Sequence, residues 1–246
     1  MNKSYAFISD IHGNSLALTE VLKDINKRDI ATIYNLGDTL LGPLDLHGTF
    51  EILKNHNITH LMGNGDRELL LPDDGSPTTI NDNRRMLTLE EKNWLSSLPS
   101  TIQTEHFWLF HGSPRSDEEY LLENLDSSGT YHKPLDELKK MLPDNTPPVI
   151  VCGHSHLPRI VQIPEGPLVV NTGSVGLPAY KDELPFVHKM ESMSPDAKYV
   201  ILEKSNYGWA AKIIHVPYDY KPMADLARSQ NRPDWVHALE TGFALD

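Results

Sequence analysis

The chain has 246 residues, of which 39% are hydrophobic and 23% are charged. This composition excludes a disordered or low-complexity protein and predicts a single α/β domain over residues 1–246. A formal net charge of −12 disfavours long nucleic acid as a partner, because proteins bind the phosphate backbone with clustered Lys and Arg. No apolar segment approaches the roughly 20 residues of a membrane-spanning helix, so we expect no membrane partner.

The single cysteine, Cys152, excludes an intramolecular disulfide and fits a reducing compartment. It ends the apolar segment 149–152, and we therefore interpret it as a small core residue. The apolar residues near the N-terminus lead directly into Asp10, a candidate functional residue, so cleavage of a signal peptide there would damage the site. We expect a cytoplasmic protein.

Strands and helices alternate from the N-terminus to residue 62. Apolar segments at 6–8, 30–36 and 58–62 predict three buried strands. The spacing of the apolar residues between them predicts two helices, whose buried faces are Leu18, Val21, Leu22 and Ile25, and Leu46, Phe50 and Leu53. This βαβ order implies parallel strands joined by right-handed crossovers.

The middle of the chain, residues 67–147, contains helical and loop segments that we expect to overhang the site. Thr88 and Glu91 have the spacing of a capping box, which predicts the start of a helix. The acidic stretch 117–126 reads as a solvated loop and, with the residues that follow it, as a candidate lid.

Strand pairs are predicted for the last third of the chain, at 159–163 with 168–171 and at 199–203 with 210–216. They favour two sheets that face each other. Two short helices follow, at 223–229 and 235–239, with apolar residues at helical spacing. Their apolar faces can cover the domain itself or contact a second copy, so a homo-oligomer is an open alternative.

Five short segments place an Asp, Asn or His beside a Gly at the end of an apolar segment. They are Asp10-Ile-His12-Gly13-Asn14, Gly37-Asp38, Gly63-Asn64-Gly65-Asp66, His111-Gly112-Ser113 and Gly153-His154-Ser155-His156. Loops at the carboxyl ends of parallel strands gather side chains from distant segments. Alternate residues of extended backbone point the same way, so each pair separated by one residue is expected to address the same cluster. The ordered set predicts a two-metal phosphoesterase site.

The donor types indicate which metals this site would take. Carboxylate, imidazole and amide donors without a thiolate favour two divalent ions, Mn or Fe before Zn, over Mg, which prefers oxygen ligands. The candidate ligands are Asp10, His12, Asp38, Asn64, His111, His154 and His156.

Over residues 6–178 these motifs resemble the calcineurin-like metallophosphoesterases, most closely the small bacterial and archaeal phosphodiesterases with a Gly-Asn-x-Asp third motif. The resemblance implies a four-layer αββα sandwich, in which two facing mixed β-sheets are flanked by helices and a dinuclear metal site lies at the carboxyl edge of the strands. It implies that Asp38 bridges the metals, with the remaining ligands divided into Asp10, His12 and His156 at one and Asn64, His111 and His154 at the other. Residues 171–176 resemble the turn that supports the ligand loops in this branch.

The resemblance also implies direct attack on phosphorus by a hydroxide that bridges the two metals. Many relatives carry a histidine that helps protonate the leaving oxygen, but Gly65 stands at that position here. A general acid is therefore absent or lies elsewhere, with Asp66, His132 and His47 as weak candidates. Asn14 and Arg67 are candidate substrate contacts, although Asn14 also reads as a helix N-cap and Arg67 as a solvated cation.

The leading functional hypothesis is a phosphodiesterase that hydrolyses small phosphodiesters or nucleotide phosphoanhydrides, with a small phosphorylated molecule as substrate. A phosphomonoesterase or protein phosphatase of the same fold is the nearest alternative. A non-catalytic interaction module, resembling the retromer subunit of this fold, is a second alternative. A nuclease is the third alternative, and the negative net charge of the chain counts against it.

Overall fold

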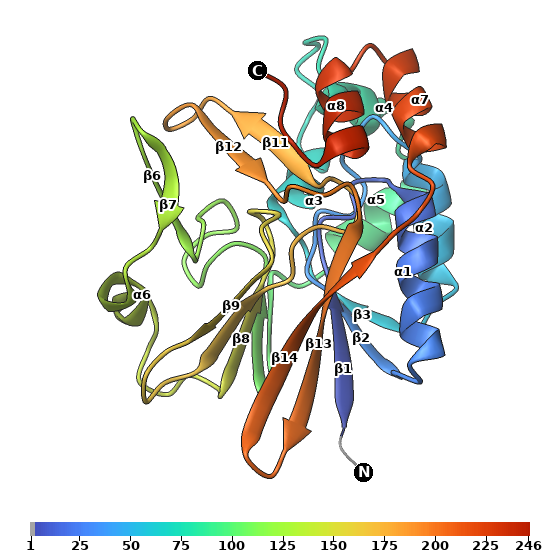
Figure 1. Cartoon of the computed structure of the whole chain (residues 1–246). Helices are drawn as coiled ribbons and strands as arrows, with labels where there is room; N and C mark the ends of the chain where they lie inside the picture. Colours follow the sequence, from blue (N-terminus) through green and yellow to red (C-terminus); the bar gives the residue numbers. More distant parts are fainter. Residues whose placement is uncertain (1–2) are drawn as a thin grey trace.

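The computed structural model describes residues 3–246, so residues 1 and 2 of the predicted domain lie outside it. Two five-stranded mixed sheets face each other, and helices flank them, which confirms the predicted αββα sandwich (Figure 1). The strand orders are β14-β13-β1-β2-β3 and β4-β5-β8-β10-β9. Among the described residues, no helix combines the length and the apolar character needed to cross a bilayer.

The first sheet contains the predicted parallel strands. Its members are β1 (Ser4–Ile8), β2 (Thr32–Asn35), β3 (Ile58–His60), β13 (Ala197–Ser205) and β14 (Gly208–Val216). Strands β1, β2 and β3 are parallel, while β13 runs antiparallel to both β1 and β14. The helices α1 (Ser15–Lys27) and α2 (Leu46–Lys54) follow β1 and β2, and the faces predicted for them are buried.

The second sheet supplies the other half of the central core. Its members are β4 (Thr101–Gln103), β5 (Phe107–Phe110), β8 (Val149–Cys152), β9 (Arg159–Gln162) and β10 (Leu168–Asn171). The predicted antiparallel pairing of β9 with β10 is confirmed. Apolar side chains of both sheets pack between them, including Phe7, Leu36, Phe107, Val151 and Val200. This packing brings the carboxyl ends of β1, β2, β5 and β8 to one end of the molecule.

The remaining helices are α3 (Asn64–Leu69), α4 (Thr79–Met86), α5 (Leu89–Ser96), α6 (Leu135–Met141), α7 (Lys221–Ser229) and α8 (Pro233–Thr241). Helix α5 begins with the predicted capping box of Thr88 and Glu91. Helices α7 and α8 pack on each other, and α8 lies against strand β11 (Ala179–Asp182), so their apolar faces cover the domain itself (Figure 1).

Two hairpins were not predicted. Strands β6 (Glu123–Asp126) and β7 (Gly129–His132) form one, and β11 with β12 (His188–Glu191) form the other. The prediction of a solvated loop over 117–126 is therefore wrong for residues 123–126, which form β6, whereas residues 117–122 do form a loop. The side chain of Glu123 is buried and accepts a hydrogen bond of 2.7 Å from Arg159 Nε, a partner that the local sequence does not reveal.

Candidate metal centre

The seven candidate ligands converge at the carboxyl ends of the central strands. Asp10 and Asp38 follow β1 and β2, Asn64 begins α3, His111 follows β5, and His154 and His156 follow β8. Asp10, His12 and His156 form the first cluster of carboxylate and imidazole groups, and Asp10, Asp38 and His111 form the second. Asn64 and His154 line the same cavity as His12, Asp38 and His156. The predicted convergence is thus observed.

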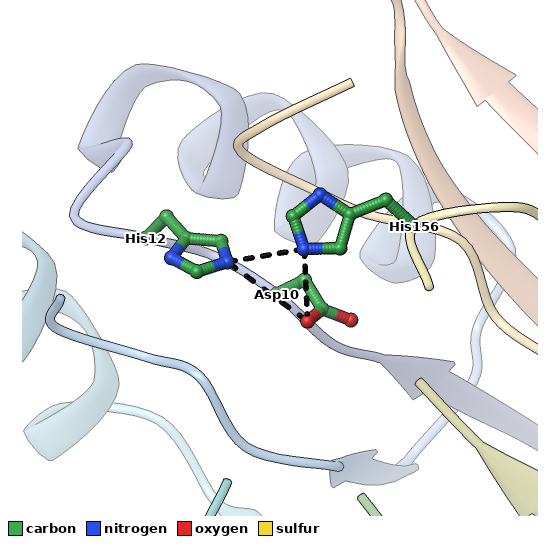
Figure 2. Close-up of side chains that lie close together, drawn as sticks. All are labelled: Asp10, His12 and His156. Carbon is green, nitrogen blue, oxygen red and sulfur yellow. Dashed lines mark hydrogen bonds and ion pairs between the residues drawn. The ribbon is translucent and has the colours of Figure 1, made fainter. Parts of the chain in front are cut away.

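The first cluster brings three electron-pair donors together (Figure 2). His156 Nε2 lies 3.2 Å from Asp10 Oδ1 and 3.2 Å from His12 Nε2. The Nδ1 atom of His12 lies 2.8 Å from the Leu41 carbonyl oxygen, and that of His156 lies 2.6 Å from the Leu177 carbonyl oxygen. Because a carbonyl oxygen can only accept, both Nδ1 atoms donate, and the two Nε2 lone pairs face each other. A cation between these atoms would relieve that repulsion.

The second cluster contains buried atoms that lack a partner. His111 Nδ1 donates to the Leu36 carbonyl oxygen at 2.8 Å, which leaves Nε2 facing the carboxylates of Asp38, at 3.5 Å, and Asp10, at 3.9 Å. That Nε2 atom, Asp10 Oδ1 and Asn64 Oδ1 are buried without a hydrogen-bond partner among the described residues. Burial by itself lowers the pKa of His111, but the carboxylates of Asp38 and Asp10 raise it to about 10. The cluster therefore favours a positive charge at its centre, and these residues fit a bound cation.

His154 is oriented in the opposite sense to the other three histidines. Its Nε2 atom donates to the Glu118 carbonyl oxygen at 3.0 Å, so Nδ1 keeps the lone pair. The ring of Tyr120 stacks on the His154 ring, with centroids 4.7 Å apart. The loop that contains Glu118 and Tyr120 thus determines which nitrogen His154 can offer to a metal.

The backbone at the ligands is left-handed. The φ angles are 56° at Asp10, 51° at His12, 53° at Asp38, 69° at His154 and 59° at His156. The argument that extended backbone aims each pair at one cluster is therefore wrong, although the pairs do converge. Positive φ is uncommon for residues other than glycine and is concentrated at functional sites, where the surrounding structure holds it in place.

Close backbone approach also shapes the site. A Cβ atom at Gly63 would lie 2.2 Å from Asp38 Oδ1, so the third motif needs glycine for the Asp38 carboxylate to reach its position. Ser174 Oγ donates to the Asp10 carbonyl oxygen at 2.8 Å and accepts from the Leu177 N–H at 2.8 Å. The turn at 171–176 thus supports a ligand loop, as the resemblance implies.

A cavity of about 600 Å³ opens over the candidate ligands. Its other walls come from Tyr120, from strand β11 with Tyr180, and from helix α8 with Trp235. Of the described residues at 67–147, Tyr120 alone lines this cavity, while His111 reaches the candidate ligands beneath it. The sequence did not predict that these residues line the cavity. The helical spacing of apolar residues around Trp235 predicted a helix there, but not its position beside the site.

Residues 4–192 match the family model for the calcineurin-like phosphoesterase superfamily domain. The chain belongs to this superfamily. The calcineurin-like phosphoesterase superfamily is metal-dependent, in agreement with the candidate ligand clusters.

Relatives of this phosphoesterase extend over nearly the whole chain. The uncharacterized protein MJ0912 of Methanocaldococcus jannaschii is 26% identical over 94% of each chain. A metallophosphoesterase from Sphaerobacter thermophilus has a similar structure, with a TM-score of 0.77, 22% identity and coverage of 98% of this chain and 100% of that one. The hypothetical protein PH1004 of Pyrococcus horikoshii OT3 gives a TM-score of 0.73 at 19% identity, with coverage of 98% and 99%. These two likenesses support the fold.

Asn14 has no free polar atom for a substrate of this phosphoesterase. Its Oδ1 accepts from the Ala17 N–H at 3.1 Å, which confirms the N-cap. Its Nδ2 donates to the Gly176 carbonyl oxygen at 3.0 Å and to the Tyr218 hydroxyl at 2.9 Å. Because all of its hydrogen-bonding groups have partners, the geometry counts against the predicted substrate contact.

Asp66 of this phosphoesterase is buried against the backbone of the ligand loops and does not line the cavity. Its carboxylate accepts backbone N–H groups from Thr39 at 2.9 Å and from Gly63 at 3.2 Å. Burial and the nearby charge of Asp38 raise the pKa of Asp66 to about 7. These contacts position the loops that carry Asp38 and Asn64, and they count against a catalytic role through a held water.

The other weak candidates are also engaged outside the cavity. Arg67 pairs with two acidic side chains of the 117–118 loop and does not line the cavity. His47 Nδ1 lies 2.6 Å from Glu91 Oε1, and His132 Nε2 lies 3.2 Å from Arg159 Nη1. Neither histidine lines the cavity over the phosphoesterase's metal-ligand candidates.

Proposed function

We propose that this protein is a phosphodiesterase with a dinuclear centre that hydrolyses small phosphodiesters. The observation that carries the proposal is the first cluster, where two imidazole lone pairs and a carboxylate oxygen lie 3.2 to 3.9 Å apart and face one another. A second cluster adjoins it and shares Asp10. Two divalent ions would supply Lewis-acid stabilisation of the phosphate charge and make bound water more acidic.

The proposed division of ligands follows the two clusters. Asp10, His12 and His156 would hold one ion, and the second would be held by Asn64, His111 and His154. Asp38 can serve both, because its Oδ2 lies 3.8 Å from His12 Nε2 while its Oδ1 lies 3.5 Å from His111 Nε2. The mixed nitrogen and oxygen donors favour Mn or Fe, with Zn as the alternative.

The carbonyl oxygens of Leu36, Leu41 and Leu177 orient three of the histidines and make them better donors. At the third motif, the Gly65 N–H donates to Asp38 Oδ1 at 2.8 Å and offers no acid to the leaving oxygen. The protein therefore contributes binding and orientation, and esters with good leaving groups are the favoured substrates.

The cavity volume suits a small substrate. A putative diadenosine tetraphosphatase shares the fold at a TM-score of 0.56 and 17% identity, covering 87% of this chain and 94% of its own. Hydrolysis of nucleotide phosphoanhydrides is therefore the second candidate within the same proposal.

Parallel assays with Mn-loaded protein test the proposal. We expect bis(p-nitrophenyl) phosphate to be hydrolysed with a higher kcat/KM than p-nitrophenyl phosphate. Elemental analysis of the same preparation should find two metal ions per chain. A higher kcat/KM for the monoester would identify a phosphomonoesterase instead. Two bound ions with no hydrolysis of either ester would favour a non-catalytic module.

A further inference from the structure

An aromatic wall stands beside the first ligand cluster. The ring of Trp235 lies 5.9 Å from the His12 ring at an interplanar angle of 82°. The ring of Tyr180 lies 4.7 Å from the His156 ring at 70°. Both aromatic residues line the cavity, and the two histidine rings that they contact lie 5.0 Å from each other. A group attached to a phosphate at the candidate metal centre would therefore meet this wall.

The Trp235 ring is held firmly in this position. A Cβ atom at Gly42 would lie 2.7 Å from Trp235 Cη2. The ring therefore packs directly against the backbone of Gly42, where a larger residue would collide with it. The Arg232 guanidinium lies over the ring, with its carbon 5.6 Å from the centroid. Because Trp235 is only 8% exposed, its small accessible surface is fixed before any ligand arrives.

The Tyr180 hydroxyl is already engaged, so this residue presents its ring and not a free donor. The hydroxyl donates to the His154 carbonyl oxygen at 3.2 Å and lies 2.7 Å from the Tyr120 hydroxyl. The neighbouring lining side chains are apolar, namely Leu41, Leu177 and Ala179. The wall thus suits an apolar, planar group.

The charged lining of the cavity disfavours a second phosphate. Four carboxylates and two cations line it, namely Asp182, Glu183, Asp234 and Asp246 with Lys181 and Arg232. Arg232 is paired with Asp234, with Nη2 2.5 Å from Oδ2, and Asp246 is paired with Lys189, with Nζ 2.6 Å from Oδ1. Together with Lys189 these side chains still carry a net negative charge, so a second anionic group would be repelled there.

We propose, building on the phosphodiesterase function above, that Trp235 and Tyr180 determine specificity by binding a planar aromatic group of a substrate with a single phosphate. Aryl and nucleoside monophosphate diesters have this chemistry, whereas dinucleoside polyphosphates do not. Trp235 lies on α8, beyond residues 4–192, so the specificity comes partly from outside the segment that the family model matches.

Binding of two phosphonates tests the wall without any turnover. We expect Mn-loaded protein to bind phenylphosphonate about tenfold more tightly than methylphosphonate in calorimetric titrations. Trp235→Leu should abolish this preference. Trp209→Leu, which removes a tryptophan from β14 outside the cavity, should retain it. Where Trp235→Leu fails to fold, Tyr180→Leu at the more accessible side of the wall provides the same test.

The outcomes separate the two proposals. Equal binding of both phosphonates by the unaltered protein, or an unchanged preference in the folded Trp235→Leu and Tyr180→Leu variants, would overturn the specificity proposal while leaving the phosphodiesterase proposal intact. Failure to hydrolyse any ester, with the phenyl preference present and lost in Trp235→Leu, would overturn the phosphodiesterase proposal and leave the aromatic site standing. A higher kcat/KM for dinucleoside tetraphosphate than for thymidine 5′-p-nitrophenyl phosphate would contradict the single-phosphate specificity.

Discussion

Arg67 forms a two-point ion pair with Asp117, with Nε 2.7 Å from Oδ2 and Nη2 3.1 Å from Oδ1. Nη2 also donates to Glu118 Oε1 at 2.8 Å. The backbone carbonyl of Glu118 accepts the His154 Nε2–H, so Arg67 fixes the loop that orients a candidate ligand. Arg67, which the sequence suggested as a substrate contact, is thus connected to the candidate metal centre through Glu118 and His154.

Arg67→Met should weaken binding of one of the two proposed metal ions by about tenfold, because partners that orient a metal ligand typically contribute this much. A manganese titration followed by electron paramagnetic resonance measures the two affinities separately. Arg85→Met is the matched control, since Arg85 forms a similar pair with Asp73 away from the cavity. Unchanged metal affinity together with a raised KM would show that Arg67 contacts substrate instead.

Asp38→Asn should lower kcat by at least about 10²-fold, because one carboxylate faces both clusters and its charge would be lost. We expect metal occupancy to fall below the two ions per chain proposed for the unaltered protein, as measured by elemental analysis of the purified variant. Glu20→Gln, on an accessible position of α1, is the control for a lost carboxylate. A variant that retained both ions and near-normal turnover would refute the bridging assignment.

Hydrolysis should depend steeply on the leaving group, because Gly65 supplies no acid and the other candidates lie outside the cavity. General acid catalysis typically contributes about 10²–10⁴-fold, so alkyl diesters should react far more slowly than aryl diesters. The measurement is kcat for a series of substituted aryl esters, under conditions where the chemical step limits turnover. A shallow dependence would reveal a proton donor.

The stability of the protein should fall between pH 6.5 and pH 4 through His60. Burial lowers the pKa of His60 to about 4 in the folded protein, whereas the unfolded chain titrates near 6.5. As the pH falls through this range, the unfolded state takes up a proton that the folded state does not, and the free energy of unfolding decreases.

Urea unfolding at several pH values measures this effect. His60→Phe loses the hydrogen bond between His60 Nδ1 and Asn35 Nδ2, a cost that is present at neutral pH. Relative to this variant, the unaltered protein should lose stability steadily from pH 6.5 to 4 and remain constant above pH 7.5. A difference that does not change with pH would show that His60 titrates normally in the folded protein.

The convergence of the candidate ligands could be predicted from sequence because it follows from general features of the fold. Strands β1, β5 and β8 have buried apolar segments, β2 is half-buried, and the candidate ligands that follow these strands lie within four residues of the strand ends. The capping box at Thr88 could be predicted equally well, because its two partners lie three residues apart in the sequence. Local patterns of this kind identify elements and their ends.

Features that depend on distant partners could not be predicted in this way. The sequence around Asn14 is compatible with a phosphate contact. The structure shows that the side-chain amide of Asn14 donates to the hydroxyl of Tyr218, a residue far away in the sequence. The spacing of Trp235 fits the buried face of a helix equally well, and only the folded chain shows that this residue lines the cavity. The hairpin of β11 and β12 has short strands with many charged residues, which alternation patterns do not reveal.

The left-handed backbone at five of the seven candidate ligands has a consequence for protein engineering. Copying the seven side chains onto another scaffold with ordinary strand-to-loop connections would aim most of them in the wrong direction. Such a graft has to reproduce the main-chain conformation of the loops, together with the neighbouring carbonyls that hold the imidazoles. Random libraries at these five positions should accordingly recover Gly and Asn more often than Val or Ile whenever selection is for folding alone.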